Sequence, residues 1–262
     1  MTVITSRDNS RVRRWRELTR DARARRAQGS VLLEGSNLVA ACLDAKISIK
    51  DLIVSESAAD RAAFAALAKR SSRVPVVLAD AVFRSIGDTE APAGIAAEIA
   101  LPATGPDLKA SAGCVLLDAI QDAGNVGAIL RSAAAFGIAD AVLGAGCADA
   151  WSPKVLRAAM GAHFAMYIAE SADLAAAIAD FSGPVLCTAP RGGTPLPQAE
   201  LPGRVAWLFG AEGRGVSAEL AAHAALRVSI PMRGATESLN VAAAAAICFY
   251  EHARRGGAVR YT

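Results

Sequence analysis

Five polar side chains lie in three short segments of the chain, and their types could together act on a hydroxyl-bearing substrate. An arginine binds phosphate and stabilises developing negative charge, while a carboxylate can anchor an arginine or neighbouring backbone. Amide and hydroxyl groups donate and accept hydrogen bonds, so they can orient a sugar or shape a loop. The candidates are Asn125 and Arg131 in NVGAILRSAAAFG, Glu212 in LFGAEGRGVS, and Ser238 and Asn240 in ATESLNVAAAAAI.

Each segment also has a plain structural interpretation. Asn125 can cap a helix, which would leave Arg131 as a surface residue. The glycines around Glu212 fit tight turns, or they leave room for a ligand against the backbone. Ser238 and Asn240 directly precede an alanine-rich run and suit the start of a helix. No single segment decides between a turn or cap and a site.

The three segments follow apolar runs that are typical of buried strands. Strand and helix patterns alternate from Cys114 to the end of a last helix, which we expect from about Ser238 to Arg255. Wholly apolar strands separated by helices predict a parallel sheet that is covered on both faces, with ligands beyond the carboxyl ends of its strands. The strands are expected at CVLLDAI, DAVLGAG, FAMYIA, PVLCTAP, RVAWLFG and LRVSIPM.

A smaller α/β domain is expected before this sheet. VLLEG, IKDLIVSE, VPVVLA and residues 95–99 are typical strands, and SNLVAACLDA and DRAAFAALAKR are typical helices. The stretch LPATGPDLKASAG is rich in proline, glycine and threonine, as linkers are. We therefore predict two domains, residues 1–105 and residues 112–262.

Basic residues are concentrated at the N-terminus. The first 26 residues hold nine arginines against three acidic residues, although the whole chain carries a net charge of only +3. Arginines crowded around Trp15 are typical of a surface that contacts a phosphate backbone, but a solvated helix face would look similar. If the surface binds RNA, the candidate contacts are Arg7, Arg11, Arg13 and Arg14.

Several other classes of protein are disfavoured. The five cysteines and three histidines are scattered without metal-ligand spacing, so we expect no metal site and reduced core thiols. The glycines of VLGAGCAD lack the rest of a dinucleotide fingerprint, and no P-loop occurs. No apolar run is long enough to span a bilayer, and the N-terminus lacks a secretory h-region. A cytoplasmic location is expected.

Taken together, the three segments resemble the motifs of the SpoU (TrmH-like) family of RNA ribose 2′-O-methyltransferases, in the same order and spacing. SPKVLRAAMGAHF is also similar to a family segment, so the resemblance covers residues 114–255. More loosely, SRDNSRVRRWREL, VLLEG and GDTEAPAGIAAEI resemble the L30e-like substrate-binding domain that many members carry.

The resemblance implies a trefoil-knotted α/β (SPOUT) fold, a homodimer formed through the knotted domain, and S-adenosyl-L-methionine as cofactor. It implies catalytic roles for Asn125, Arg131, Glu212, Ser238 and Asn240. The cofactor would be held by Glu212 and by backbone near the residues listed here: Thr188, Leu208, Gly210, Ile230, Met232 and Leu239. The two-domain build and basic N-terminus favour ribosomal RNA as the substrate. A transfer-RNA 2′-O-methyltransferase and a non-catalytic RNA-binding protein with the same fold are the alternatives.

Within that resemblance, we assign the chemistry differently from a scheme in which Arg131 is the base. A guanidinium is essentially never deprotonated in proteins, so Arg131 is a poor proton acceptor. We expect Arg131 to bind the phosphate beside the target ribose and to stabilise the developing alkoxide. Asn125, Ser238 and Asn240 would orient the sugar and shape the loop, while Glu212 would anchor Arg131 or nearby backbone. The proton acceptor is not identified.

Overall fold

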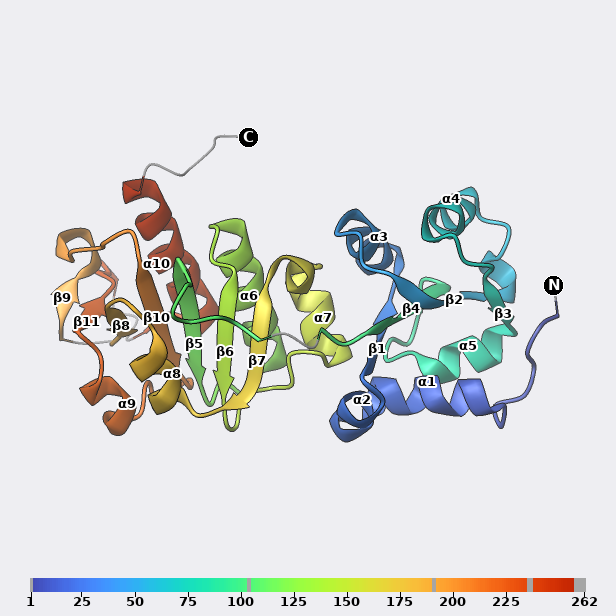
Figure 1. Ribbon diagram of the computed structural model, residues 1–262, viewed down its shortest axis with the longest axis horizontal. Helices are drawn as coiled ribbons and strands as arrows, with labels where there is room; N and C mark the ends of the chain where they lie inside the picture. Colours follow the sequence, from blue (N-terminus) through green and yellow to red (C-terminus); the bar gives the residue numbers. More distant parts are fainter. Residues whose placement is uncertain (1, 103–104, 190–191, 235–237, 257–262) are drawn as a thin grey trace. The chain divides into compact units, whose positions relative to one another are not determined.

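The computed structural model describes residues 2–102, 105–189, 192–234 and 238–256. The chain forms two compact units (Figure 1). One unit comprises residues 1–103 and 151–164, and the other comprises residues 104–150 and 165–262. The sequence placed residues 151–164 in the second domain, whereas their contacts group them with the first unit.

The first unit is a four-stranded mixed sheet with helices on both faces. The strand order is β1-β4-β2-β3, in which β4 runs antiparallel to both neighbours and β3 runs parallel to β2. Figure 1 shows α1 and α5 on one face of the sheet and α3 and α4 on the other. The elements are α1 (Ser10–Arg20), α2 (Ala22–Gln28), β1 (Ser30–Glu34), α3 (Ser36–Asp44), β2 (Ile49–Ser55), α4 (Ala62–Ser71), β3 (Val76–Leu78), α5 (Asp80–Ile86), β4 (Ile95–Ala100) and α7 (Pro153–Ala159).

The second unit contains a seven-stranded sheet, and its paired strands are all parallel, as the apolar strand patterns predict. The strand order is β7-β6-β5-β10-β8-β11-β9. The elements are β5 (Gly113–Asp118), α6 (Ala123–Ala135), β6 (Asp140–Gly144), β7 (Tyr167–Ala172), α8 (Leu174–Asp180), β8 (Val185–Thr188), β9 (Thr194–Pro195), β10 (Val205–Gly210), α9 (Ala218–Ala222), β11 (Leu226–Ser229) and α10 (Val241–Arg255).

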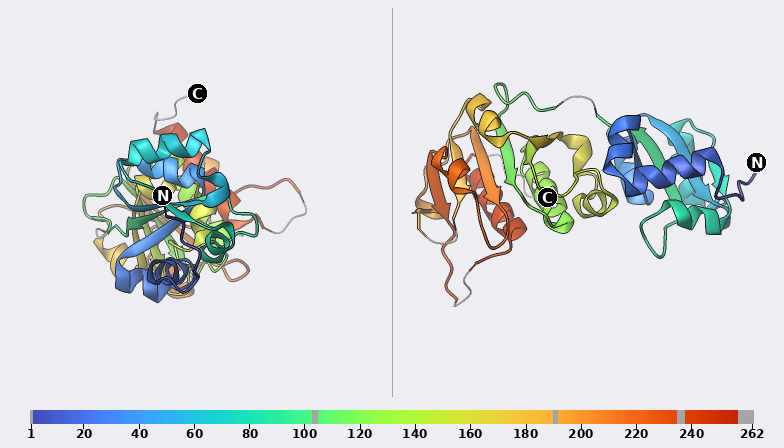
Figure 2. Two further views of the ribbon diagram at one scale, coloured as in Figure 1. Left: turned by 90° about the vertical axis from the view of Figure 1, so that its right-hand side faces the viewer. Right: turned by 90° about the horizontal axis from the view of Figure 1, so that it is seen from below.

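The central strand β10 shows how side-chain alternation builds two cores. Ala206 and Leu208 are buried in a cluster with residues of α8 and α9. The alternate residues face the other way: Phe209 meets Phe249 of α10 edge to face, with ring centroids 5.6 Å apart. Figure 2 shows α6 and α10 beside each other on one side of this sheet. Because successive strand residues point to opposite faces, a single strand can anchor helices on both sides.

The mixed α/β architecture and the parallel sheet agree with the fold expected from the sequence. The trefoil-knotted path of the chain stays a prediction. Among the described residues, no helix has both the length and the apolar character needed to cross a bilayer.

Candidate functional site

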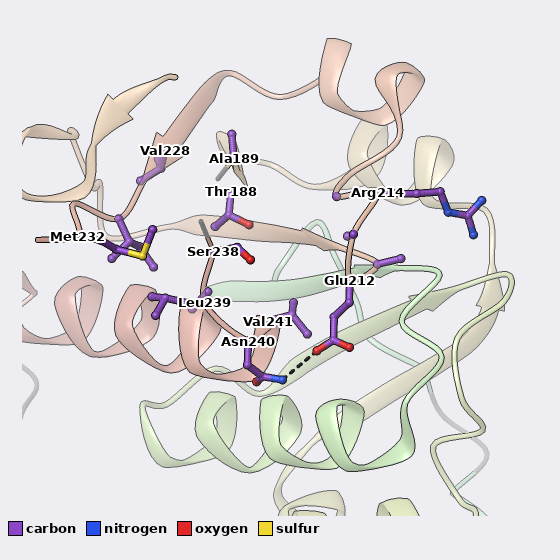
Figure 3. A pocket seen from close by; sticks show the side chains of 16 residues that line it. Thr188, Ala189, Glu212, Arg214, Val228, Met232, Ser238, Leu239, Asn240 and Val241 are labelled. Atoms are coloured by element: carbon purple, nitrogen blue, oxygen red, sulfur yellow. Dashed lines mark hydrogen bonds between the residues drawn. The ribbon is translucent and has the colours of Figure 1, made fainter. Parts of the chain in front are cut away.

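A cavity of about 660 Å³ opens at the carboxyl ends of three neighbouring strands, β10, β8 and β11, as expected for a parallel sheet. The start of α10 forms another wall (Figure 3). The lining of the cavity mixes apolar side chains with a few polar ones, which is typical of a site for a small organic ligand. The lining residues include Thr188, Gly210, Glu212, Ile230, Met232, Ser238, Leu239 and Asn240.

Asn240 caps α10 and also belongs to this wall. Its side-chain Oδ1 accepts hydrogen bonds from the backbone N–H groups of Ala242 (2.9 Å) and Ala243 (3.3 Å). Its Nδ2 points the other way, toward Glu212 (Figure 3). One side chain thus satisfies two unpaired donors at the helix N-terminus and keeps two donors of its own for the site. The helix begins at Val241, three residues after the Ser238 start that the sequence suggested.

Asn125, Glu212 and Asn240 form a closed triangle of hydrogen bonds, although they lie far apart in the sequence. Glu212 Oε1 accepts from Asn125 Nδ2 at 2.7 Å and from Asn240 Nδ2 at 2.8 Å. Asn240 Nδ2 also donates to Asn125 Oδ1 at 2.9 Å. Hydrogen bonds to an ionised acceptor are stronger than neutral ones, so the carboxylate holds the two amides together. The three sequence segments therefore meet at one point.

Asn125 is free for this contact because another residue caps its helix. The cap of α6 is Asp122, whose Oδ1 accepts from the backbone N–H of Asn125 at 2.8 Å. Asn125 is the third residue of the helix and not its cap, which contradicts the capping interpretation of this residue.

Glycine allows the loop that carries Glu212 to fold back on strand β10. A Cβ at Gly210 would lie 2.0 Å from the backbone carbon of Gly215, a distance that no side chain tolerates. The Gly215 N–H donates to the carbonyl of Ala211 at 2.8 Å, with Gly215 at φ +68°. Beyond the turn, the N–H of Ser217 donates to Asp118 Oδ2 at 2.8 Å, which ties the loop to the end of β5. These two hydrogen bonds fix the loop that carries Glu212.

The structure does not bring every predicted residue to the cavity. Ser238 lines it, and six of the seven predicted cofactor contacts do so as well. The seventh, Leu208, has a fully buried side chain in the core, so any cofactor contact there would be through its backbone. Asn125 and Arg131 are not among the lining residues, and Arg131 is exposed on α6. The roles assigned to all of these residues stay predictions.

Three residues near the site were not singled out from the sequence. Asp118 and Asp122 have structural roles that an acidic residue at a strand end or a helix start would suggest. Arg214 lines the cavity, but its guanidinium points away from the space between the strands (Figure 3). Its position between two glycines was the only sequence signal for it.

The cysteines do not offer a nucleophile. Burial raises the pKa of the Cys42 thiol to about 11 and that of Cys248 to about 12, and it also raises the pKa of Cys147 and Cys187. A nucleophilic cysteine needs a lowered pKa, so these thiols stay protonated near neutral pH. Among the described residues, no group of three or more His, Cys, Asp or Glu side chains could hold a metal ion.

Substitutions at Asn240 can separate its two contacts. We expect Asn240→Ser to keep the helix cap, because serine caps well, but to lose both amide donors to the triangle. The activity that the sequence predicts should fall at least tenfold in Asn240→Ser and in Asn240→Ala, since a charge-assisted hydrogen bond contributes about 1.5–3 kcal/mol. The unfolding free energy of Asn240→Ala should be about 1 kcal/mol lower than that of Asn240→Ser, because only the alanine variant also loses the helix cap. Denaturant titrations and initial rates give both values, and normal rates in Asn240→Ser would show that the triangle is dispensable.

Two family models match the chain in succession. Residues 9–97 match the MRM3-like substrate binding domain, and residues 113–250 match the SpoU rRNA Methylase family. The second match spans more than half of the chain and contains the cavity, the triangle and the loop around Glu212.

Similar proteins extend over almost the whole chain. The chain is 32% identical to the 23S rRNA (guanosine(2553)-2′-O)-methyltransferase RlmP of Bacillus subtilis, over 95% of this chain and 98% of the relative. A TrmH-family structure from Porphyromonas gingivalis matches with a TM-score of 0.82 and 33% identity, over 95% and 98% of the two chains. The AdoMet-bound rRNA methyltransferase from Sinorhizobium meliloti matches with a TM-score of 0.81 and 28% identity, over 97% and 98%.

Proposed function

The chain belongs to the SpoU rRNA methylase family, and on that premise we propose that it methylates a ribose 2′-hydroxyl of ribosomal RNA with S-adenosylmethionine as the donor. The observation that carries the proposal is the cavity at the strand ends, which is lined by Glu212 and Asn240, the two residues that Asn125 joins in the hydrogen-bonded triangle. That cavity lies inside the matched region, and a relative with similar architecture holds AdoMet.

The cavity fits this cofactor in size and in chemistry. Its volume of about 660 Å³ lies within the range of pockets for drug-sized ligands. Ile230, Met232 and Leu239 offer an apolar surface for a flat base, while Thr188 and Ser238 offer hydroxyl groups. When bound, S-adenosylmethionine supplies an electrophilic methyl group on a sulfonium. The residues named here would hold it.

The protein groups would act by alignment and by electrostatic stabilisation. Holding the hydroxyl in line with the methyl group converts an encounter into an intramolecular step. The triangle keeps Asn125 and Asn240 in fixed orientations, so the wall of the site is set before RNA arrives. Arg131 is proposed to bind the phosphate beside the target ribose and to stabilise the oxygen as it loses its proton. The acceptor of that proton is not assigned to a side chain.

The proposed partners are RNA and a second copy of the chain. The N-terminal unit, which matches a substrate binding domain, would bind ribosomal RNA. Dimerisation through the second unit is supported by a stripe on α10 in which Ala243, Ile247 and Tyr250 are exposed at helical spacing. Light scattering would give the mass in solution, and a monomer would contradict the dimer. A cytoplasmic location remains part of the proposal.

Methyl transfer with the purified protein tests the function directly. We expect tritiated methyl groups from S-adenosylmethionine to enter ribosomal RNA from cells that lack the gene, and calorimetry to show cofactor binding. Mapping 2′-O-methyl sites in that RNA would identify the nucleotide. Binding of RNA without binding of S-adenosylmethionine would favour the non-catalytic alternative. Labelling of transfer RNA alone would show that the substrate is transfer RNA and not ribosomal RNA.

A further inference from the structure

Helix α1 carries two sets of arginines that differ in what they contact. We propose that the stripe of Arg13, Arg16 and Arg20 is the surface that binds RNA phosphates, and that Arg11 and Arg14 are structural residues, because their guanidinium groups are paired with carboxylates of the sheet. The proposal rests on the proposed function, because it assigns the RNA contact of the same enzyme. Of the RNA contacts that the sequence suggested, the proposal keeps Arg13, and it adds Arg16 and Arg20.

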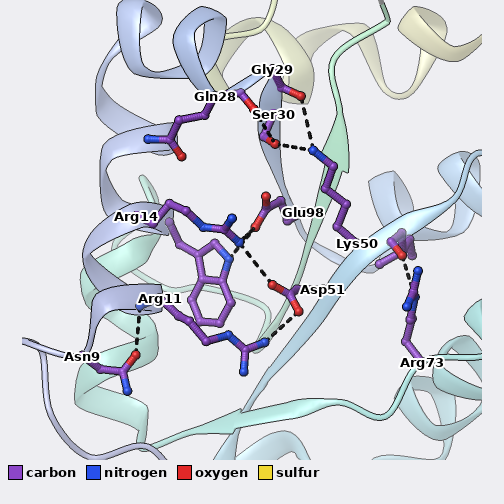
Figure 4. Close-up of polar contacts among 12 residues, drawn as sticks. Asn9, Arg11, Arg14, Gln28, Gly29, Ser30, Lys50, Asp51, Arg73 and Glu98 are labelled. Atoms are coloured by element: carbon purple, nitrogen blue, oxygen red, sulfur yellow. Dashed lines mark hydrogen bonds and ion pairs between the residues drawn. The ribbon is translucent and has the colours of Figure 1, made fainter.

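Arg11 and Arg14 are occupied by carboxylates of the sheet (Figure 4). Arg11 donates to Asp51 Oδ1 at 2.7 Å, and Arg14 reaches Asp51 Oδ2 at 3.3 Å and Glu98 Oε2 at 2.5 Å. Glu98 is fully buried, so a cation beside it compensates a charge that water cannot reach. The Trp15 indole N–H donates to the same oxygen at 2.8 Å. These two arginines therefore hold α1 on the sheet.

Arg25 is a third structural arginine, and it is buried. Its side chain is 4% exposed, and its Nη1 donates to the carbonyls of Leu18 (2.6 Å) and Thr19 (3.3 Å). Those carbonyls lie in the last turn of α1, where a helix leaves backbone acceptors without intrahelical partners. Three of the arginines crowded at the N-terminus, Arg11, Arg14 and Arg25, thus have structural roles.

Arg13, Arg16 and Arg20 lie on a different side of α1. Their spacing of three and four residues places them in one row, about 10 Å long at 1.5 Å per residue. Arg13 and Arg20 are exposed, and none of the three forms a salt bridge within the described part of the chain. Arg16 is half-buried, and its Nη2 donates to the Arg7 carbonyl at 3.3 Å and to Ser85 Oγ at 3.4 Å.

Among the described residues, no acidic side chain forms an ion pair with this row. Glu17 is exposed between Arg13 and Arg20, and its carboxylate accepts a hydrogen bond from Gln28 Nε2 at 3.4 Å. A row of guanidinium groups without ion-pair partners attracts a polyanion, and its length along α1 matches several successive phosphates of one strand. A phosphate backbone is therefore the ligand that fits.

Salt dependence of RNA binding measures the number of phosphate contacts. The probe is a fluorescein-labelled RNA stem-loop of arbitrary sequence, titrated with the full-length protein at several salt concentrations. We expect Arg13→Gln/Arg20→Gln to lower the slope of log K against log salt by about 1.4 to 1.8, since each contact contributes about 0.7 to 0.9. The thermal unfolding midpoint should stay unchanged, because both side chains are exposed and neither forms an ion pair within the described residues.

Two matched variants test whether the change in slope is specific to the arginines of the proposed surface. Lys46→Gln/Lys69→Gln removes the same charge from exposed positions on the side of α3 and α4, and it should leave the slope unchanged. Arg11→Gln should also leave it unchanged, whereas Arg13→Gln lowers it. The proposal would be overturned if the lysine variant lowered the slope as much as Arg13→Gln/Arg20→Gln does, or if Arg11→Gln lowered it as much as Arg13→Gln does. A wild-type slope in Arg13→Gln/Arg20→Gln would also overturn it.

The result is separable from the proposed activity. If the slope changes as expected but the wild-type protein transfers no methyl group, the RNA surface stands and the activity fails. If the protein methylates RNA and the slope of the double variant is that of wild type, the surface alone is wrong.

Discussion

Replacing Arg131 with alanine is expected to lower methyl transfer by at least about a hundredfold while leaving binding of S-adenosylmethionine intact, because one group that stabilises a developing oxyanion contributes about 10²–10³ in rate. Arg131 lies outside the cavity lining, so cofactor affinity should not depend on it. The side chains of the triangle are two neutral amides and one carboxylate. Positive charge near the reacting oxygen must come from another group.

Arg214 is the matched control for Arg131. It is an exposed arginine on the cavity lining, and its guanidinium points away from the strand ends (Figure 3). Arg214→Ala should retain most of the transfer activity. Single-turnover rates and calorimetry on both variants test this pair of expectations. Near-normal transfer in Arg131→Ala, or a loss confined to Arg214→Ala, would show that the wrong arginine has been assigned.

Replacing Arg14 with alanine is expected to destabilise the N-terminal unit by about 2 to 3 kcal/mol, because it removes a cation from a fully buried carboxylate. Breaking a buried pair costs about 3–5 kcal/mol, and we lower this value because the Arg14 side chain is itself 43% exposed. Glu98 would keep only the Trp15 N–H on its Oε2, and its Oε1 has no hydrogen-bond partner in the described structure. Denaturant unfolding of the full chain, followed by far-UV circular dichroism, measures the loss.

Two further variants distinguish charge from packing at this position. Arg13→Ala removes an arginine from the same helix and should change the unfolding free energy by less than about 0.5 kcal/mol, as surface substitutions usually do. Arg14→Ala/Glu98→Gln removes the buried charge together with its partner, and should recover part of the stability lost in Arg14→Ala. If the double variant were less stable than Arg14→Ala, the carboxylate would not be the source of the cost.

Local patterns were sufficient for the sheet and for the location of the site. Apolar strands separated by helices predicted the parallel sheet, and parallel sheets bind ligands at their carboxyl edge. Both rules depend on hydrophobic periodicity and chain direction, which can be read directly from the sequence. Local rules were less reliable at helix starts: Asn125 and Ser238 suit a cap by residue type, but Asp122 and Asn240 occupy those positions. Several residues of similar capping strength compete within one turn, and tertiary contacts decide among them.

The sequence by itself determined the residue types at the site, the order of the motifs and the excess of arginine at the N-terminus. Only the tertiary structure decided which of these groups share a contact. Asn125 and Asn240 meet on one oxygen of Glu212 because β5 and β10 are neighbours in the sheet and α10 begins beside them. Arg13 and Arg14 are adjacent and chemically identical, yet Arg14 contacts a buried acid and Arg13 faces solvent. A helix turns 100° per residue, so what lies on each side of it fixes the role of each charge.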